Sequence, residues 1–278
     1  MQQIAIISSS RDPAGVNIRN NLIELFGFEK IGEKFDDNGI YQYNKIPNKI
    51  IKLHLTNNDL IFSENIDKKI NADIFIFASK HRSKENTQSF AAHPIGNWGK
   101  AEFGGKEKAL CPSSAILLKN MFIGLNGTGK NSNYEITLEA THHGPYVEKP
   151  AVFVEIGSTE KEWTYRKNGN IIATTIIKAL ENQNKDYKIA VGIGGQHYCS
   201  NFNKVVLRTD IAISHICPKY HLDKLNEDLI KQAISETVEK IDFVVLDWKG
   251  LGTGKQRIVE LLKNMDLEVR RTEQILSI

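Results

Sequence analysis

Residues 1–26 read MQQIAIISSSRDPAGVNIRNNLIELF, and this opening stretch decides the fold class. Residues 2–8 form an apolar run of strand length, which a short polar segment follows. Asp12 is a favourable N-cap residue and Pro13 fits the first turn of a helix, while Ile18 and Leu22 begin an apolar stripe at helical spacing. The stretch therefore predicts a strand, a loop and a helix.

The same alternation of strand-length apolar runs with helical segments continues along the chain, which is typical of an α/β protein. Strands are predicted at residues 72–78, 134–140, 151–156, 188–193, 211–216, 243–247 and 267–270. Residues 41–43 and 50–55 predict a hairpin at a sheet edge. Helices are predicted at residues 112–125, 170–181, 227–240 and 255–265.

No repeat, low-complexity tract or linker divides the 278 residues, so a single domain over residues 1–278 is expected. Residues 80–107 lack clear periodicity and carry glycines and histidines. A loop of this length inside a domain is either functional or contains an undetected element, and its composition favours a functional loop.

Composition narrows the classes of protein. With 41% hydrophobic and 25% charged residues, the chain fits a globular protein and neither a disordered nor a membrane protein. No targeting signal or membrane span is recognised, and three widely spaced cysteines fit reduced thiols, so a cytoplasmic location is expected. The net charge of +3 permits nucleic acid as a partner only through local clusters of Lys and Arg.

Five of the eight histidines lie at or just past the end of a predicted strand: His81, His142, His143, His197 and His215. Ligands bind outside the carboxyl ends of strands in open α/β sheets, so these rings are expected to converge. Each one taken alone is more often a structural residue, but their shared placement favours a site. His54 and His221 are interpreted as structural or solvated.

The segment ASKHRS at residues 78–83 and the segment AHPIGNWG at residues 92–99 add further polar groups. His81 and His93 can act as bases or metal ligands, whereas Arg82 can hold phosphate. Asn97 can donate to an oxyanion. A long solvated loop is an equally acceptable interpretation.

The segment THHGP at residues 141–145 fixes two adjacent imidazoles at a strand end. Because adjacent side chains diverge, only one of His142 and His143 is expected to point into the site. Glu139 could support a ring as a hydrogen-bonded carboxylate, but a place on the solvent face of an edge strand is favoured slightly.

Two glycine-rich turns can approach a ligand. GIGGQHY at residues 192–198 either leaves the N–H groups of Gly194 and Gly195 free for an anion, or only supplies a tight turn. DWKGLGTGK at residues 247–255 follows a strand and opens a helix, which favours phosphate bound by its glycines and lysines over an ordinary turn. The candidate residues of this second turn are Lys249, Gly250, Gly252 and Lys255.

Six dispersed motifs, in the same order along nearly the whole chain, resemble those of the archaeal and plant D-aminoacyl-tRNA deacylases. They are SKHRS (79–83), HPIGNWGKAEFGG (93–105), THHGP (141–145) with VEIGS (154–158), GGQHY (194–198), SHICPKY (214–220) and LDWKG (246–250). Tyr146 and Ser200 depart from the expected pattern, which puts the substrate preference in doubt but not the resemblance.

The resemblance implies hydrolysis of the ester between a D-amino acid and the terminal ribose of tRNA, in an archaeal-type enzyme. It also implies zinc as cofactor and a three-layer α/β/α fold with a mixed sheet, similar to nucleoside phosphorylases and peptidyl-tRNA hydrolases. The motif positions carry over onto His81, His93, His142, His143, His197 and His215, without a settled role for each. We take His81, His93, His142, His143 and His197 as the catalytic candidates, and His142, His197 and His215 as the candidate zinc ligands.

The expected partner is tRNA charged with a D-amino acid, with no membrane and no obligate protein partner. Two other functions remain open: a zinc-dependent amidase or peptidase on small substrates, and a non-catalytic module that binds tRNA.

Overall fold

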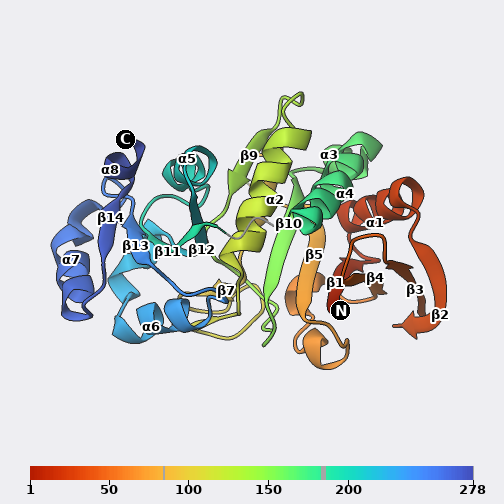
Figure 1. Ribbon diagram of the computed structural model, residues 1–278, viewed down its shortest axis with the longest axis horizontal. Coiled ribbons are helices and arrows are strands. Elements are labelled where there is room, and N and C mark those ends of the chain that lie inside the picture. The colour runs from red at the N-terminus through yellow and green to blue at the C-terminus, as the bar shows by residue number, and fades with distance from the viewer. Residues whose placement is uncertain (84, 183–185, 278) are drawn as a thin grey trace.

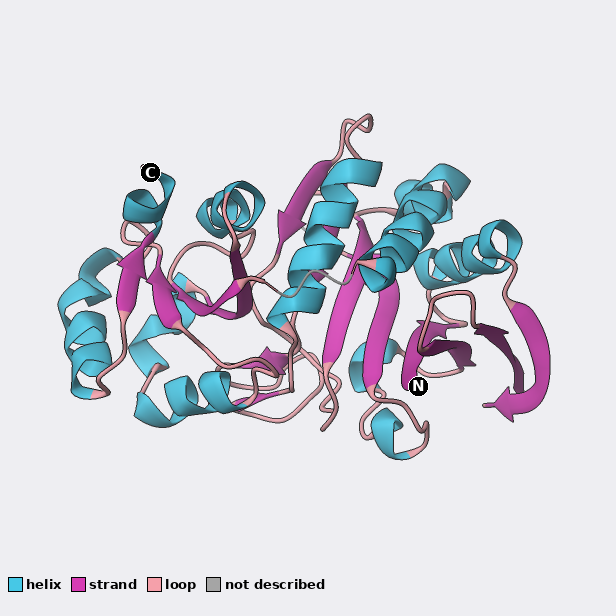
Figure 2. Ribbon diagram, in the orientation of Figure 1, coloured by secondary structure: helices cyan, strands magenta, loops and turns pink. Residues whose placement is uncertain are grey.

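The structure is a computed structural model that describes residues 1–83, 85–182 and 186–277. In this part of the chain the strands form two main sheets, shown in Figures 1 and 2. The larger sheet has eight strands in the order β2-β3-β4-β1-β5-β10-β6-β9, and the smaller has four in the order β12-β11-β13-β14.

The strands of the larger sheet are β1 (Gln2–Ser9), β2 (Glu29–Phe35), β3 (Asn38–Tyr43), β4 (Lys49–Thr56), β5 (Ile74–His81), β6 (Ser89–His93), β9 (Glu135–Leu138) and β10 (Ala151–Gly157). Those of the smaller sheet are β11 (Lys188–Ile193), β12 (Ile211–Cys217), β13 (Phe243–Leu246) and β14 (Val269–Arg271). A separate pair joins β7 (Gly96–Asn97) to β8 (Ala109–Leu110).

The helices are α1 (Pro13–Phe26), α2 (Ala115–Thr128), α3 (Glu160–Thr164), α4 (Arg166–Glu181), α5 (Ser200–Arg208), α6 (Glu227–Ser235), α7 (Lys255–Asn264) and α8 (Thr272–Leu276). The short 3₁₀ turns are η1 (Leu60–Phe62), η2 (Ile66–Lys68), η3 (Lys219–Lys224) and η4 (Gly252–Gly254).

The opening unit is formed as predicted. The Asp12 side chain accepts hydrogen bonds from the backbone N–H groups of Ala14 and Gly15, at 2.9 and 3.0 Å, and Pro13 occupies the first turn of α1. Gly27 ends the helix in the left-handed conformation that glycine adopts without strain. Because β1 pairs in parallel with both β4 and β5, this unit lies at the centre of the larger sheet.

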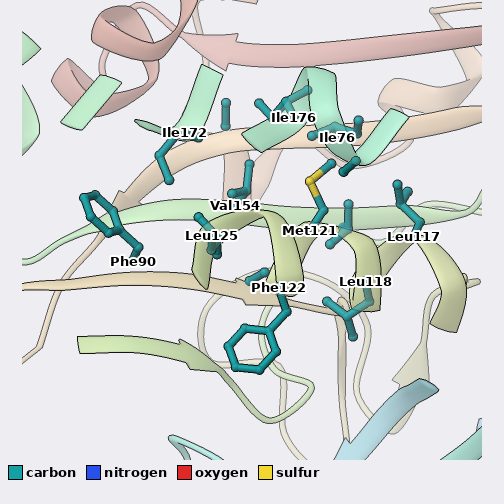
Figure 3. Close-up of a cluster of buried hydrophobic side chains, with 14 of the residues drawn as sticks. Ile76, Phe90, Leu117, Leu118, Met121, Phe122, Leu125, Val154, Ile172 and Ile176 are labelled. Atoms are coloured by element: carbon teal, nitrogen blue, oxygen red, sulfur yellow. The ribbon is translucent and has the colours of Figure 1, made fainter. Parts of the chain in front are cut away.

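Each sheet lies between two layers, which confirms the predicted α/β class and mixed sheet. Alternate residues of β1 separate the layers of the larger sheet: Ile4 and Ile6 pack under α1, α2 and α4, whereas Ala5 and Ile7 face η1, η2 and loops. Figure 3 shows the first of these cores, where Met121 of α2 lies on the side of the helix that faces Val154 of β10. In the smaller sheet α5 and α8 cover one face, and α6 and α7 cover the other.

Several sequence predictions need correction. Residues 80–107 are not one long loop, because β5 continues to His81 and the segment contains β6 and β7; residue 84 of this segment lies outside the described residues. The β3–β4 hairpin exists, but β2 pairs outside it and forms the edge instead. The helix predicted at residues 227–240 ends at Ser235. Helix α5 is absent from the predictions, because its Asn and Lys residues mask the apolar stripe of Phe202, Val205 and Val206.

Among the described residues, no helix is both long and apolar enough to pass through a membrane.

The buried His54 in β4 gives the fold a measurable pH dependence. Burial lowers its pKa to about 4, so in the window between pH 6.5 and 4 the unfolded chain binds a proton that the folded chain excludes. Stability is therefore fully present above this window and is lost as the pH falls through it. The wild type should lose about 2 kcal/mol more than His54→Gln between pH 7 and pH 5, measured by urea unfolding. Parallel losses in both proteins would contradict this assignment.

Candidate active site

Two buried carboxylates form the centre of the candidate site. Glu155 lies in β10 and Glu139 directly follows β9, and both are almost completely excluded from solvent, at 3% and 0% exposure. Glu155 shares a strand face with Phe153, which belongs to the core opposite the long helices. The site is therefore built on the face of the larger sheet that the long helices do not cover.

Three imidazole rings surround Glu139. The nearest approaches to its carboxylate oxygens are 3.3 Å from His81 Nδ1, 3.5 Å from His142 Nε2 and 3.4 Å from His197 Nε2. Neither oxygen makes a hydrogen bond within the described part of the chain. Buried carboxylate oxygens without partners are costly, so this environment favours a bound cation or donor.

Glu155 holds the other side of the site. His81 Nδ1 lies 3.3 Å and His93 Nε2 3.8 Å from one of its oxygens, and the Ser79 hydroxyl donates to the other at 2.6 Å. Ser79 and His81 are two positions apart in β5, so their side chains project from the same face of the sheet. His81 thus links the two carboxylates.

The five rings expected to be catalytic lie together. Ring centroids are separated by 4.1 Å for His93 and His142, 4.3 Å for His142 and His143, and 4.6 Å for His142 and His197. His81 joins them through Glu139. The structure therefore brings His81, His93, His142, His143 and His197 into one cluster.

The predicted reason for this convergence is only partly right. β5 and β10 are parallel, but β6 runs antiparallel to β10, and β9 is parallel to β6. The carboxyl ends of β5 and β6 therefore point in opposite directions, and the shared sheet face brings their residues together. His197 arrives from the smaller sheet, on the turn that follows β11.

The expectation that His142 and His143 diverge is wrong. Both rings contact His93, because His143 adopts a positive φ of 46° that turns the chain at this residue. The slightly favoured place for Glu139 on a solvent face is also wrong. Its side chain is fully buried at the centre of the cluster.

Backbone carbonyls fix the tautomers of three histidines. The Nδ1 atoms of His93, His142 and His143 lie 3.0, 2.7 and 2.6 Å from the carbonyl oxygens of Pro94, Ala140 and Gly144. A carbonyl oxygen only accepts, so each Nδ1 carries the proton in these contacts. The neutral rings of His142 and His143 then present an Nε2 lone pair, as metal-binding and general-base histidines do. For His93, burial lowers the pKa, but the interaction with Glu155 and the charge of that carboxylate outweigh burial and raise the pKa.

Two tyrosines extend the cluster. The Tyr198 hydroxyl lies 2.9 Å from His81 Nε2, and the Tyr220 hydroxyl lies 3.1 Å from His197 Nδ1. The Tyr220 residue is 53% exposed, so His197 and Tyr220 lie at the solvent side of the cluster. Neither tyrosine was singled out from the sequence.

The charges of the cluster are uneven. Burial lowers the pKa of His81, but its hydrogen bond to Glu155 and the charges of Glu139 and Glu155 outweigh this and raise the pKa to about 9. Burial, reinforced by repulsion from neighbouring imidazolium groups, keeps the pKa of His142 far below its usual range and lowers that of His143 to about 4. At neutral pH His81 is therefore cationic, while His142 and His143 are neutral.

Three other predicted residues lie outside the cluster. His215 is not part of the groups of described residues whose geometry suits a metal; its Nδ1 lies 3.3 Å from the Thr141 hydroxyl, and burial lowers its pKa to about 4. The Asn97 amide donates to the carbonyls of Gly104 and Lys106, and therefore braces a loop. Arg82 is exposed, with its guanidinium 5.3 Å from the Trp163 ring centroid.

The glycine turns pack against each other beside the cluster. Gly194 N–H donates to the Cys217 carbonyl, so the prediction of a free donor is wrong for this residue. Gly250 N–H donates to Asp247. Gly195, Lys249, Gly250 and Gly252 line a cavity of about 400 Å³ with Lys219 and Asp247. Lys255 is not part of this lining, and its ammonium lies over the Trp248 ring.

The residue most clearly missed by sequence reasoning is Glu155. It stands in the run AVFVEIG, where a single carboxylate interrupts an otherwise apolar strand, and a buried charge in such a strand is rare unless it is paired. That interruption was the available signal.

Comparisons with known proteins show the family of this chain. The family model for D-aminoacyl-tRNA deacylase matches residues 68–270, which include every residue of the cluster. A relative from Thermococcus kodakarensis with the same name is 37% identical over 275 residues, covering 96% of this chain and 98% of the relative. The chain belongs to the D-aminoacyl-tRNA deacylase family.

Other members of the deacylase family are similarly complete matches. The D-aminoacyl-tRNA deacylase of Methanocaldococcus jannaschii is 33% identical, and 96% of this chain and 98% of that relative are covered. A crystal structure of a conserved protein of unknown function has a TM-score of 0.89 and 30% identity, covering 99% of this chain and 96% of the other. The fold described above is thus shared over nearly the entire chain.

Proposed function

We infer that this protein hydrolyses the ester bond of D-aminoacyl-tRNA and releases the free amino acid and tRNA. The observation that carries this inference is a cluster of five histidines, three of which approach buried Glu139, in a member of the deacylase family. Ester hydrolysis requires groups that activate water and stabilise a developing oxyanion, and neutral imidazoles beside buried charges suit both tasks.

We propose that His142 and His197, on the accessible side of the cluster, activate the water. Their side chains are 23% and 33% exposed, whereas Glu139 is fully buried beneath them. A neutral imidazole in this position can either accept a proton from the water that attacks the aminoacyl carbonyl or bind a metal ion that activates this water. Cationic His81 balances the charge of Glu139 and Glu155, and holds both carboxylates in place.

Zinc fits the chemistry of these residues. Ligand atoms of Glu139, His142 and His197 lie within 4.8 Å of one another, and so do those of His93, His142 and His143. The oxygens of Glu139 make no hydrogen bond within the described residues, which suits them to bind a cation. We propose Glu139, His142 and His197 as the ligands, so that Glu139 takes the place expected for His215. Zinc held there would act as a Lewis acid and lower the pKa of water.

Metal removal tests this assignment. Protein purified without a His tag should contain zinc, and prolonged chelation should reduce turnover until zinc is restored, because two imidazoles and a carboxylate form a common catalytic zinc site. Metal content would be measured by mass spectrometry, with Glu139→Gln as the variant expected to retain less zinc. Full activity in metal-free protein would instead assign the reaction to the histidines alone.

The function itself is tested by comparing three substrates. D-Aminoacyl-tRNA should be hydrolysed much faster than the L form of the same aminoacyl-tRNA, and faster than a D-amino acid methyl ester without RNA. Amino acid release would be measured under single-turnover conditions. Equal rates with and without RNA would favour a small-substrate amidase or peptidase, and binding without hydrolysis would favour a non-catalytic tRNA module.

The proposed partner is tRNA that carries a D-amino acid, in the cytoplasm and without an obligate protein partner. Three free, buried cysteines support a reducing compartment. Exposed cations near the cluster support RNA contact, among them Arg82 and Lys249, and Lys255 extends this charge along the turn before α7.

A further inference from the structure

Two short segments link the lining of the cavity to the histidine cluster. Gln196 lines the cavity and the next residue, His197, faces Glu139. In the same way Lys219 lines the cavity, and the next residue, Tyr220, contacts His197. Consecutive Cα atoms are about 3.8 Å apart, so the lining and the cluster lie within about one residue of each other at two places along the backbone.

The charge of this cavity suits an anion. Lys219 and Lys249 are exposed, and neither forms an ion pair within the described ranges. Asp247 is the carboxylate in the lining, but it is already bonded, because it accepts from Asn201 Nδ2 at 3.1 Å and from Gly250 N–H at 3.2 Å. The two ammonium groups thus remain available for a ligand.

An exposed aromatic residue follows Lys219 of the cavity lining and contacts the cluster. The Tyr220 hydroxyl is fixed to His197 Nδ1, while the residue remains 53% exposed. An exposed ring beside free lysines is the usual arrangement of sites for single-stranded nucleic acid, where bases stack on the ring and phosphate meets the cations.

We propose that the cavity and Tyr220 form the subsite for the terminal nucleotide of the tRNA acceptor end. The 5′-phosphate of that nucleotide binds Lys219 and Lys249, its base lies against the Tyr220 ring, and its esterified ribose faces His197. This assignment rests on the proposed function and specifies which part of the tRNA the site recognises. It predicts that one nucleotide with its phosphate supplies much of the recognition near the reacting bond.

Binding measurements test the subsite independently of hydrolysis. Adenosine 5′-monophosphate should bind the wild type about tenfold or more tighter than adenosine, as a hydrogen bond to a charged group typically contributes. The double variant Lys219→Ala/Lys249→Ala should lose this difference. The control Lys204→Ala removes an exposed cation of α5 outside the cavity and should keep it. Binding would be measured by calorimetry. Equal affinities of the wild type for adenosine 5′-monophosphate and adenosine would overturn the proposal, and so would an undiminished preference for the monophosphate in the double variant.

Hydrolysis provides the second test. With 3′-(D-aminoacyl)adenosine as substrate, a 5′-phosphate should raise kcat/KM in the wild type and in Lys204→Ala, but not in the double variant.

Tyr220→Ala should lower the ratio of kcat/KM for the adenosine ester to that for a methyl ester by roughly 5- to 150-fold, the range of base–aromatic stacking. Tyr220→Phe should retain this ratio. Loss in both tyrosine variants would contradict stacking, whereas inactivity of the wild type on D-aminoacyl-tRNA would refute the proposed function instead.

Discussion

Glu139→Gln is expected to lower kcat/KM on D-aminoacyl-tRNA by about 10²- to 10⁴-fold, the range found when a positioned acid–base group is lost. Three rings of the cluster approach the Glu139 carboxylate, at 3.3 to 3.5 Å, and glutamine keeps its size while removing its charge. The rings should lose their fixed orientation, and the affinity of the site for a cation should fall. Single-turnover deacylation measures this effect directly.

The matched control is Glu135→Gln, which removes a carboxylate from the exposed start of β9, the strand that Glu139 directly follows. It should retain wild-type turnover. Circular dichroism and melting temperature must show that Glu139→Gln remains folded, because a buried group is altered. A folded Glu139→Gln protein with near-normal activity would exclude Glu139 from the centre of the site.

His142→Ala should cause a similar loss, about 10²- to 10⁴-fold in rate. Its ring contacts His93, His143 and His197, and its Nε2 lies 3.5 Å from Glu139, so its removal opens the middle of the cluster. His143→Ala and His197→Ala should also reduce turnover, since both rings pack directly against it.

His221→Ala is the control for these variants. Its ring lies beside Gly99 and Tyr220 rather than against either carboxylate, so turnover should stay near that of the wild type. Near-normal turnover in all three folded cluster variants would contradict the assignment of the accessible side of the site. The reaction would then have to be carried by the buried groups around Glu155.

Sequence reasoning reached the α/β class and most central strands because buried parallel strands form continuous apolar runs, as in IAIIS of β1 and FVVL of β13. It missed β2, whose sequence EKIGEKF is polar because both faces of this edge strand reach solvent. It also extended α6 too far, since the local pattern does not reveal where tertiary packing ends.

The site was predicted unevenly for a similar reason. Histidines next to strand ends are visible in the sequence, and the five catalytic candidates do lie together. The partners that organise them depend on which strands run antiparallel, and this follows from long-range pairing such as Phe153 with His93. Glu139 and Glu155 therefore needed the fold before their burial became apparent, and so did the pairing of Tyr220 with His197.

The most direct measurement compares release of one amino acid, in its D and L forms, from the same tRNA by the wild type and by Glu139→Gln. The account predicts rapid release of the D form by the wild type, much slower release of the L form, and release of the D form by the variant that is about 10²- to 10⁴-fold slower than by the wild type. Equal rates for D and L forms, or wild-type release of the D form by a folded Glu139→Gln protein, would contradict it.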